Sequence, residues 1–317
     1  MFSRRSILGL LPAALAGAPI LSMAAAEPAR SLRIGYQKGG PILIAAKQNR
    51  SVETCLQPLG IDVQWLEFPY GPPLLEAMRI GSIDIGAVGN TPPIFAQAAH
   101  ADLVYIAAVP SGASGIIVPP GSELQTLHDL KGQKVAFARG SAAQNLTIAA
   151  LEKAGLSYRD IEPLYLAPAD AAAAFEHRSI DAWTIWDPFF AIYENKPGVR
   201  VLAGSQEIGP QNSFLVGSRP YVAANAGIVT KVIEEFGKVA HWAVTHREDV
   251  ARLLSEETGV PLEAMVRTVD RNPLTIEPIT DEIVHSQQEL ADRFYNLGII
   301  PTTIRVADQM WHPPSGS

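Results

Sequence analysis

Along most of the chain, segments whose apolar residues follow the pattern of a β-strand alternate with segments whose apolar residues follow the pattern of an α-helix. Residues 134–155, KVAFARGSAAQNLTIAALEKAG, begin with a short β-branched and aromatic run, pass through Gly140 and continue as a long alanine- and leucine-rich segment. The first part is typical of a buried strand and the last part of a helix that covers a sheet. Strands that alternate with helices predict an α/β fold with largely parallel sheets.

This pattern occurs twice. Residues 32–99 and residues 134–194 each read as a strand, a glycine-containing turn, a helix, a second strand, a short helix and a third strand. The tripeptide Ser82-Ile83-Asp84 returns as Ser179-Ile180-Asp181 at the same point in this order. Recurrence of the same elements in the same order predicts two similar α/β lobes that face each other.

After Arg219 the pattern becomes mostly helical, with helices expected at residues 223–246, at 248–256, after 260 and at 281–297. We expect this tail to pack on the first lobe, so that the second lobe is an insertion in the chain. The expected domains are residues 27–117 with 217–317 for lobe 1 and 118–216 for lobe 2, with hinge crossings at 114–119 and 214–218.

The N-terminus has the features of an export signal. Arg4 and Arg5 precede an apolar run from Ile7 to Ile20, and residues 24–26 are three alanines. Prolines interrupt the run, which is shorter than the roughly 20 apolar residues of a membrane span, so cleavage near Ala26 and a periplasmic product are expected. The paired arginines fit a twin-arginine signal as well as a general secretory one.

Charge and cysteine content narrow the possible partners. Removal of residues 1–26 leaves 23 basic and 32 acidic side chains, a net charge of −9, which disfavours nucleic acid or anionic lipid as a partner. Cys55 is the one cysteine in the sequence, so no internal disulfide is expected. An anionic ligand would have to be bound by local geometry, because the overall charge repels it.

Four predicted helix starts point toward the cleft between the lobes. They are the segments 39–41, 89–92, 140–142 and 186–188. The free N–H groups of a helix start attract anions, at roughly 0.3–1 kcal/mol for each helix, so that several starts must converge. The Asp187 carboxylate is expected to cap the fourth helix and to repel an anion there.

The anion is therefore expected at the second and third starts, with Gln37 reaching in from the first strand and an aromatic flank formed by Trp186 and Phe214. The candidate ligand-binding residues are Gln37, Gly39, Asn90, Thr91, Ser114, Gly140, Ser141, Ala142, Trp186, Asp187 and Phe214.

Catalytic and cofactor motifs are missing from the sequence. The serines of residues 110–116 are not in a Gly-x-Ser-x-Gly elbow, and the seven histidines have no zinc-ligand spacing. Neither Gly-x-Gly-x-x-Gly nor a phosphate-binding loop occurs. The sequence thus favours a binding protein with no cofactor, no metal site and no catalytic residue.

Several segments resemble the aliphatic sulfonate-binding proteins of bacterial ABC importers, which belong with the taurine-, nitrate- and thiamine-precursor-binding proteins. They include LRIGYQKGG, DLKGQKVAFARGSAAQNLTIAALEKAGL and NSFLVGSRPYV. The resemblance implies a periplasmic binding protein type II clamshell, in which two α/β lobes with mixed, mostly parallel sheets are joined by a two-segment hinge. It also implies a monomer that delivers an alkanesulfonate to a membrane permease driven by a cytoplasmic ATPase.

In such relatives uncharged hydroxyl, amide and backbone N–H groups meet the sulfonate oxygens, and these positions fall on Gln37, Asn90, Thr91 and residues 140–142. Asn90 departs from the family, since many relatives have Asp there. Taurine remains an alternative ligand, with Asp187 as the partner of its ammonium group, and so do nitrate and a pyrimidine thiamine precursor. A clamshell-derived enzyme and a sensor of ligand occupancy are further alternatives.

Overall fold

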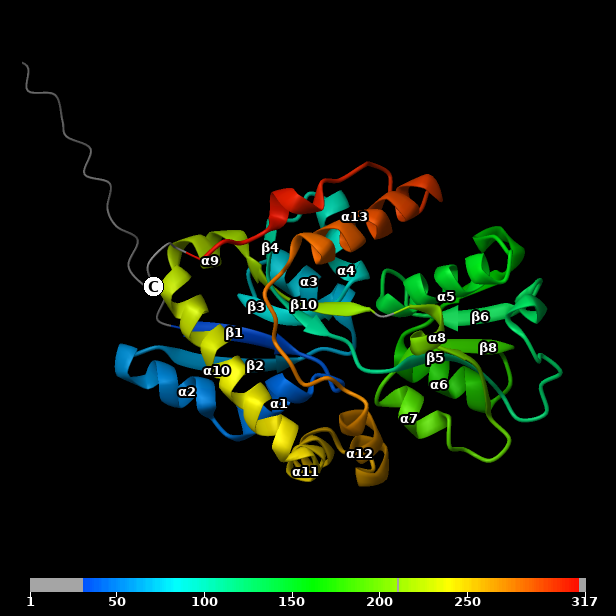
Figure 1. Ribbon diagram of the computed structural model, residues 1–317, viewed down its shortest axis with the longest axis horizontal. Coiled ribbons are helices and arrows are strands. Elements are labelled where there is room, and N and C mark those ends of the chain that lie inside the picture. Colours follow the sequence, from blue (N-terminus) through cyan, green and yellow to red (C-terminus); the bar gives the residue numbers. More distant parts are fainter. Residues whose placement is uncertain (1–30, 210, 314–317) are drawn as a thin grey trace, which may run out of the picture.

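The computed structural model describes residues 31–209 and 211–313 (Figure 1). The expected export signal, residues 1–26, lies outside them. Each of two lobes is built around a five-stranded sheet, and the two sheets share one plan. The two-lobed α/β architecture expected from the sequence is confirmed.

Lobe 1 contains the sheet with strand order β2-β1-β3-β10-β4. Its strands are β1 (Ser31–Tyr36), β2 (Asp62–Glu67), β3 (Ile85–Gly89), β4 (Leu103–Pro110) and β10 (Asn212–Ser218). β1 is parallel to β2 and β3, whereas β10 is antiparallel to both β3 and β4. The sheet is therefore mixed, and the fourth strand in its order, β10, follows lobe 2 in the sequence.

Lobe 2 repeats this plan with the order β7-β6-β8-β5-β9. Its strands are β5 (Ser114–Val118), β6 (Lys134–Phe137), β7 (Glu162–Tyr165), β8 (Ala182–Trp186) and β9 (Arg200–Gly204). β6 is parallel to β7 and β8, and β5 is antiparallel to β8 and β9. The position that β10 fills in lobe 1 is filled here by β5, the first strand after the chain leaves lobe 1.

Helices cover both faces of each sheet (Figure 1). Lobe 1 carries α1 (Pro41–Gln48), α2 (Ser51–Leu56), α3 (Gly71–Arg79), α4 (Thr91–Ala98), α9 (Arg219–Ala224), α10 (Ala226–Thr245), α11 (Arg247–Thr258), α12 (Leu262–Asp270) and α13 (Asp281–Asn296). Lobe 2 carries α5 (Ala142–Lys153), α6 (Pro168–Glu176), α7 (Phe189–Tyr193) and α8 (Ser205–Ile208). Short 3₁₀ turns lie at Gln57–Leu59, Leu127–Leu130, Tyr158–Asp160 and Val306–Gln309. The helical tail packs on lobe 1, as expected, where α10 and α11 lie against α1.

The repeated Ser-Ile-Asp tripeptide has the same structural role in both lobes. The Asp84 carboxylate accepts the backbone N–H of Arg33 at 2.8 Å, and the Asp181 carboxylate accepts the N–H of Lys134 at 2.8 Å. Each aspartate also donates its own N–H to the carbonyl of the same partner, at 2.9 Å. The aspartate thus joins β1 to the start of β3 in lobe 1 and β6 to the start of β8 in lobe 2, which explains the repeat without a ligand.

Asp84 is expected to stabilise the protein more than Asp181 does. Asp84 is 3% exposed and also binds the Arg33 guanidinium through two bonds of 2.6 and 2.9 Å, whereas the Asp181 bond is exposed. Since hydrogen bonds to charged groups contribute about 1.5–3 kcal/mol, Asp84→Ala should lower the free energy of unfolding by about 2–3 kcal/mol. Urea denaturation of both alanine variants tests this, and equal losses would contradict it.

The lobe boundaries differ from those expected. The predicted hinge at residues 114–119 is β5, which belongs to the lobe 2 sheet, and the one at 214–218 is part of β10, which belongs to the lobe 1 sheet. The crossings lie instead between β4 and β5, at residues 111–113, and between α8 and β10, where Gly209 and Gln211 are described. They are joined by a bond of 3.0 Å from the Ser111 N–H to the Gln211 carbonyl. The sequence could not show this, because the pairing partners of both strands are remote in the chain.

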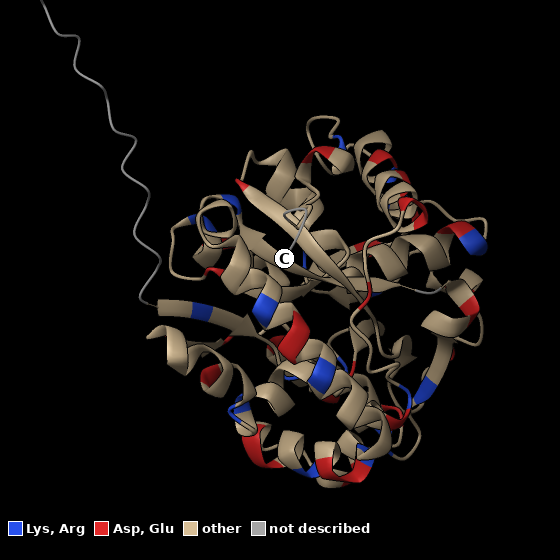
Figure 2. Cartoon of the chain, turned by 60° about the vertical axis from the view of Figure 1, so that its left-hand side comes forward, with Lys and Arg blue, Asp and Glu red and all other residues tan. Residues whose placement is uncertain are grey.

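Charged residues of both signs are dispersed over the outer helices (Figure 2). Among the described residues, no helix combines the length and apolar character needed to cross a bilayer. Within the same part of the chain, no cluster of three or more His, Cys, Asp or Glu side chains offers a metal site.

Candidate functional site

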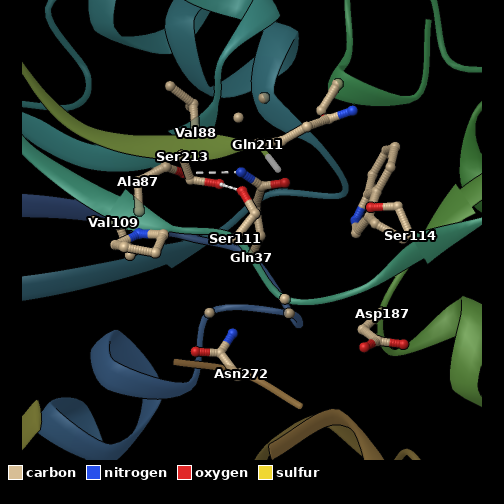
Figure 3. Close-up of a pocket in the computed structure, with 18 of the residues that line it drawn as sticks. Gln37, Ala87, Val88, Val109, Ser111, Ser114, Asp187, Gln211, Ser213 and Asn272 are labelled. Carbon is tan, nitrogen blue, oxygen red and sulfur yellow. Dashed lines mark hydrogen bonds between the residues drawn. The ribbon is translucent and has the colours of Figure 1, made fainter. Parts of the chain in front are cut away.

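A cavity of about 1000 Å³, including its mouth open to solvent, lies between the two lobes. Lobe 1 supplies the turn before α1 and the end of β3, lobe 2 supplies the start of α5 and the end of β8, and the two chain crossings form the remaining wall (Figure 3). Of the predicted site residues, those that line it are Gln37, Gly39, Ser114, Ser141, Ala142, Trp186 and Asp187. The structure therefore brings seven of these residues together at one cavity.

The start of α5 offers backbone donors from lobe 2. Gly140 has φ +69°, a left-handed conformation that favours glycine, and Ser141 is extended before the first helical turn. The Gly140 N–H donates to Gln144 Oε1 at 2.7 Å, and the Ser141 hydroxyl donates to the Ala138 carbonyl at 2.6 Å. Gly140 and the Ser141 side chain are thus committed to the turn, and the N–H groups that open α5, beginning with Ala142, lack an intrahelical acceptor.

The start of α1 is its counterpart in lobe 1. The Gly40 N–H closes the turn onto the Gln37 carbonyl at 2.9 Å, and Pro41 occupies the first helical position, where its missing N–H costs nothing. The next N–H groups, of Ile42 and Leu43, have no acceptor within the helix, and both residues line the cavity. Two helix starts from opposite lobes therefore present donors to one space.

The two anion ligands predicted at the start of α4 do not line this cavity. Thr91 is fully buried and donates its hydroxyl to Asn90 Oδ1 at 3.0 Å. The next two residues, Pro92 and Pro93, have no N–H group, so the first turn of α4 is poor in donors. Asn90 lines a second, polar cavity between α13 and α5 instead. The anion-binding role of Asn90 and Thr91 therefore stays a prediction, and neither residue lines the cavity between the lobes.

Phe214 does not form part of an aromatic flank on this cavity. Its side chain is 1% exposed and packs edge-on against Tyr105, with ring centroids 4.9 Å apart, in the core beneath α13. Neighbouring residues of a strand point to opposite faces, so it is Ser213 that faces the cavity, where its hydroxyl lies 2.9 Å from that of Ser111 (Figure 3).

Sequence reasoning also missed polar residues from the crossings and from the loop after α12. Ser111, Gln211, Ser213 and Asn272 all line the cavity. Asn272 accepts the Leu274 N–H on its side-chain oxygen at 2.9 Å, which leaves its amide NH₂ group facing the cavity (Figure 3). The change of polarity from Ser213 to Phe214 was the signal that could have found one of them.

Gln37, Ser114 and Trp186 take the expected places. The Gln37 amide donates to the Ala87 carbonyl at 2.8 Å, which fixes its side chain in the cavity wall (Figure 3). Ser114 and Trp186 are directly opposite each other in the antiparallel pair of β5 and β8. The indole therefore provides apolar surface beside a hydroxyl group at the lobe 2 side.

Asp187 is the one charged residue among the described residues that line the cavity. It is 5% exposed and accepts the Ala191 N–H at 3.1 Å. Asp187 therefore bonds the first turn of α7 as expected, but from one residue before the N-cap position, which Pro188 occupies. Arg271, which follows α12 in lobe 1, forms two parallel bonds to this carboxylate, of 2.7 and 2.5 Å. The negative charge predicted to repel an anion is therefore paired.

Burial and pairing act in opposite directions on the ionisation of this pair. Burial raises the pKa of the Asp187 carboxyl, and the Arg271 hydrogen bonds oppose this. For Arg271, burial works to lower the pKa, but the hydrogen bonds to Asp187 and Glu194 outweigh it and raise the pKa above the usual value. Arg271 thus stays charged, which is the form that the bidentate geometry requires.

The lobes touch through two glycines beside the cavity. A Cβ atom added to Gly39 would lie 2.5 Å from the Asp187 carbonyl oxygen, and one added to Gly89 would lie 3.0 Å from the Cβ of Ala142. Each contact joins a helix start of one lobe to a helix start of the other. Glycine is therefore required at residue 39 for the lobes to approach this closely, which gives this predicted site residue a steric role.

Comparison with known proteins places the chain in a family. The model of a family described as "ABC transporter, phosphonate, periplasmic substrate-binding protein" matches residues 59–241. An aliphatic sulfonates-binding protein of Escherichia coli (strain K12) is 40% identical over 312 residues, which cover 98% of this chain and 97% of that protein. The chain belongs to the aliphatic sulfonate-binding branch of the periplasmic substrate-binding proteins of ABC transporters.

Solved structures agree with this membership. The alkanesulfonate-binding protein SsuA from Xanthomonas axonopodis pv. citri, bound to MOPS, has a TM-score of 0.86 and 39% identity, covering 90% of this chain and 99% of that one. A desulfurization enzyme, DSZB, has a TM-score of 0.62 at 15% identity, which shows a shared fold alone. This sulfonate-binding family member thus has the clamshell fold, which an enzyme also uses.

Proposed function

We propose that this protein captures alkanesulfonates outside the cytoplasm and delivers them to an ABC permease for sulfur acquisition. The observation that carries the proposal is the convergence of the α1 and α5 starts on a cavity whose other polar side chains are mainly hydroxyls and amides, and whose one carboxylate, that of Asp187, is paired with Arg271. Several neutral donors can spread one negative charge over the three oxygens of a sulfonate, so no buried counter-charge is needed.

The apolar surface of the cavity suits the alkyl part of such a ligand. Trp186, Val109 and the first turn of α1 face the same space as the donors. Apolar contact contributes roughly in proportion to the area buried and discriminates poorly between chain lengths. The protein should therefore accept a range of organic sulfonates. The relative from Xanthomonas was solved with MOPS, a sulfonate whose alkyl chain ends in a heterocycle.

Isothermal titration of the mature protein in a buffer without sulfonates tests the proposal. Pentanesulfonate should bind with a Kd in the micromolar range or below, corresponding to about −8 kcal/mol. Taurine, sulfate and nitrate should bind at least about tenfold more weakly, because none of them fills both the donor seat and the apolar flank. A preference for any of the three over pentanesulfonate would contradict the proposal.

The ion pair of Asp187 bears on taurine as the alternative ligand. The taurine ammonium group would need a free carboxylate, and both oxygens of Asp187 accept from Arg271. Binding taurine in this way would break a charge-assisted pair that is largely buried, which is costly. This observation favours an alkanesulfonate without an amino group.

The proposed setting follows from the family and the sequence. The protein would be exported, cleaved near Ala26, and would act as a periplasmic monomer that meets a permease driven by a cytoplasmic ATPase. It would bind its ligand without catalysis, since the described residues that line the cavity include four serines but no histidine to activate them; the serines are Ser111, Ser114, Ser141 and Ser213.

A further inference from the structure

A group of four charged side chains joins the lobes beside the cavity. Arg271 lies between two carboxylates of lobe 2, with bonds of 2.5 and 2.7 Å to Asp187 and of 2.8 and 3.1 Å to Glu194. Arg267 lies 3.6 Å from Glu194 on the same side. Both arginines belong to lobe 1, and in Figure 1 the α12 segment lies beside α7. The group is therefore balanced in charge only when the two lobes are together.

Arg271 is held away from the ligand space. It is not among the residues that line the cavity, and its guanidinium lies 4.8 Å from the ring centre of Phe190, which does not line the cavity either. Its hydrogen bonds to Asp187 and Glu194, both in lobe 2, fix the position of the guanidinium. A direct contact between Arg271 and a ligand would need both pairs to open.

The ligand side of the same carboxylate has no basic partner. Among the described residues that line the cavity there is no Lys or Arg, and Asp187 is the one acid. An unpaired carboxylate in this largely buried position would repel an anion strongly, since screening by water is weak there.

We propose that Arg271 is a positioning residue for anion binding, which crosses from lobe 1 to neutralise the carboxylate of Asp187 as the lobes close. Closure of the two lobes then also neutralises the Asp187 carboxylate. The cavity therefore becomes suitable for a monovalent anion only in its closed form. The inference rests on the proposed function, because it assumes an anionic ligand.

Titration of pentanesulfonate into the full mature wild-type protein, an Arg271→Ala variant and a double variant tests this inference. Arg271→Ala should raise the Kd by at least about tenfold at a pH at which Asp187 is ionised, because the carboxylate is then unpaired. Burial raises the pKa of Asp187 and Arg271 opposes this, so the increase in Kd should grow as the pH rises and the carboxyl loses its proton. Adding Asp187→Asn to that variant should return the Kd to within about threefold of wild type. A role of Arg271 limited to holding the lobes together predicts no such recovery, so a double variant as weak as the single one would overturn the inference.

Arg252→Ala is the matched control. Arg252 forms a 2.5 Å pair with Asp249 within α11 alone, so its loss should leave the Kd unchanged. If Arg271→Ala does not fold by circular dichroism, Arg271→Lys keeps the charge without the parallel pair of bonds and should raise the Kd by a smaller factor. Unchanged binding by a folded Arg271 variant would overturn the inference alone, whereas no binding of pentanesulfonate by wild type would instead overturn the proposed function.

Discussion

Gly39→Ala should weaken pentanesulfonate binding about ten- to a hundredfold. The added methyl group would lie 2.5 Å from the Asp187 carbonyl oxygen, which is backbone and cannot turn aside. Overpacking of this kind costs about 1–3 kcal/mol, and here the cost applies only to the arrangement in which the lobes touch. Because the ligand needs that arrangement, its apparent affinity falls with the population of the closed form. Titration calorimetry gives the Kd, and stopped-flow measurements should show faster release.

Gly237→Ala provides the control for this variant. Gly237 lies within α10, where an added Cβ would meet no atom within 4 Å. Alanine favours a helix relative to glycine by about 1 kcal/mol, so the control should bind as wild type and unfold at an equal or higher temperature. Wild-type affinity of Gly39→Ala would mean that the lobes bind ligand without this contact.

Ala142→Pro should weaken pentanesulfonate binding by about ten- to a hundredfold, since a lost donor to a charged group costs about 1.5–3 kcal/mol. Residue 142 is the first helical position of α5, which proline favours, and Ser141 before it has φ −100° and ψ 168°, the extended conformation that proline requires of its neighbour. The substitution therefore removes one N–H group at the cavity while the helix is kept. The measurement is again the Kd by calorimetry, with circular dichroism to verify the helix content.

Ala142→Ser retains the N–H group and is the comparison for the proline variant. Its Kd should stay within about threefold of wild type, because serine is tolerated early in a helix. If the proline variant binds as tightly as the serine variant, the start of α5 is not the seat of the sulfonate, and the donors of α1 become the better candidates.

The fold was predictable because its signals are local. A strand, a glycine turn and a helix follow one another within residues 134–155, and β6, Gly140 and α5 appear there as expected. The Ser-Ile-Asp repeat is also a local signal, and it marked equivalent points of the two lobes. The hinge was misplaced because β5 and β10 pair with strands remote in sequence, and no local pattern records such partners.

The residues that line the cavity were predictable where they belong to a helix start. Ala142 and the turn before α1 reach the cavity as expected, but Asn90 and Thr91 precede two prolines that remove the donors of α4. The charge of Asp187 was foreseen, whereas its pairing with Arg271 joins two lobes and residues 84 positions apart. Contacts of that kind depend on how the lobes meet, which sequence periodicity does not describe.

The place of β10 at the interior of the lobe 1 sheet determines the order in which the chain can become structured. The strand lies between β3 and β4, yet all of lobe 2 separates it from them in the sequence. The strands of lobe 2 are contiguous in the chain, whereas the sheet of lobe 1 is complete only once β10 has joined it. A truncation before residue 212 would therefore leave lobe 1 without the strand that joins β3 to β4, although all of lobe 2 would be present.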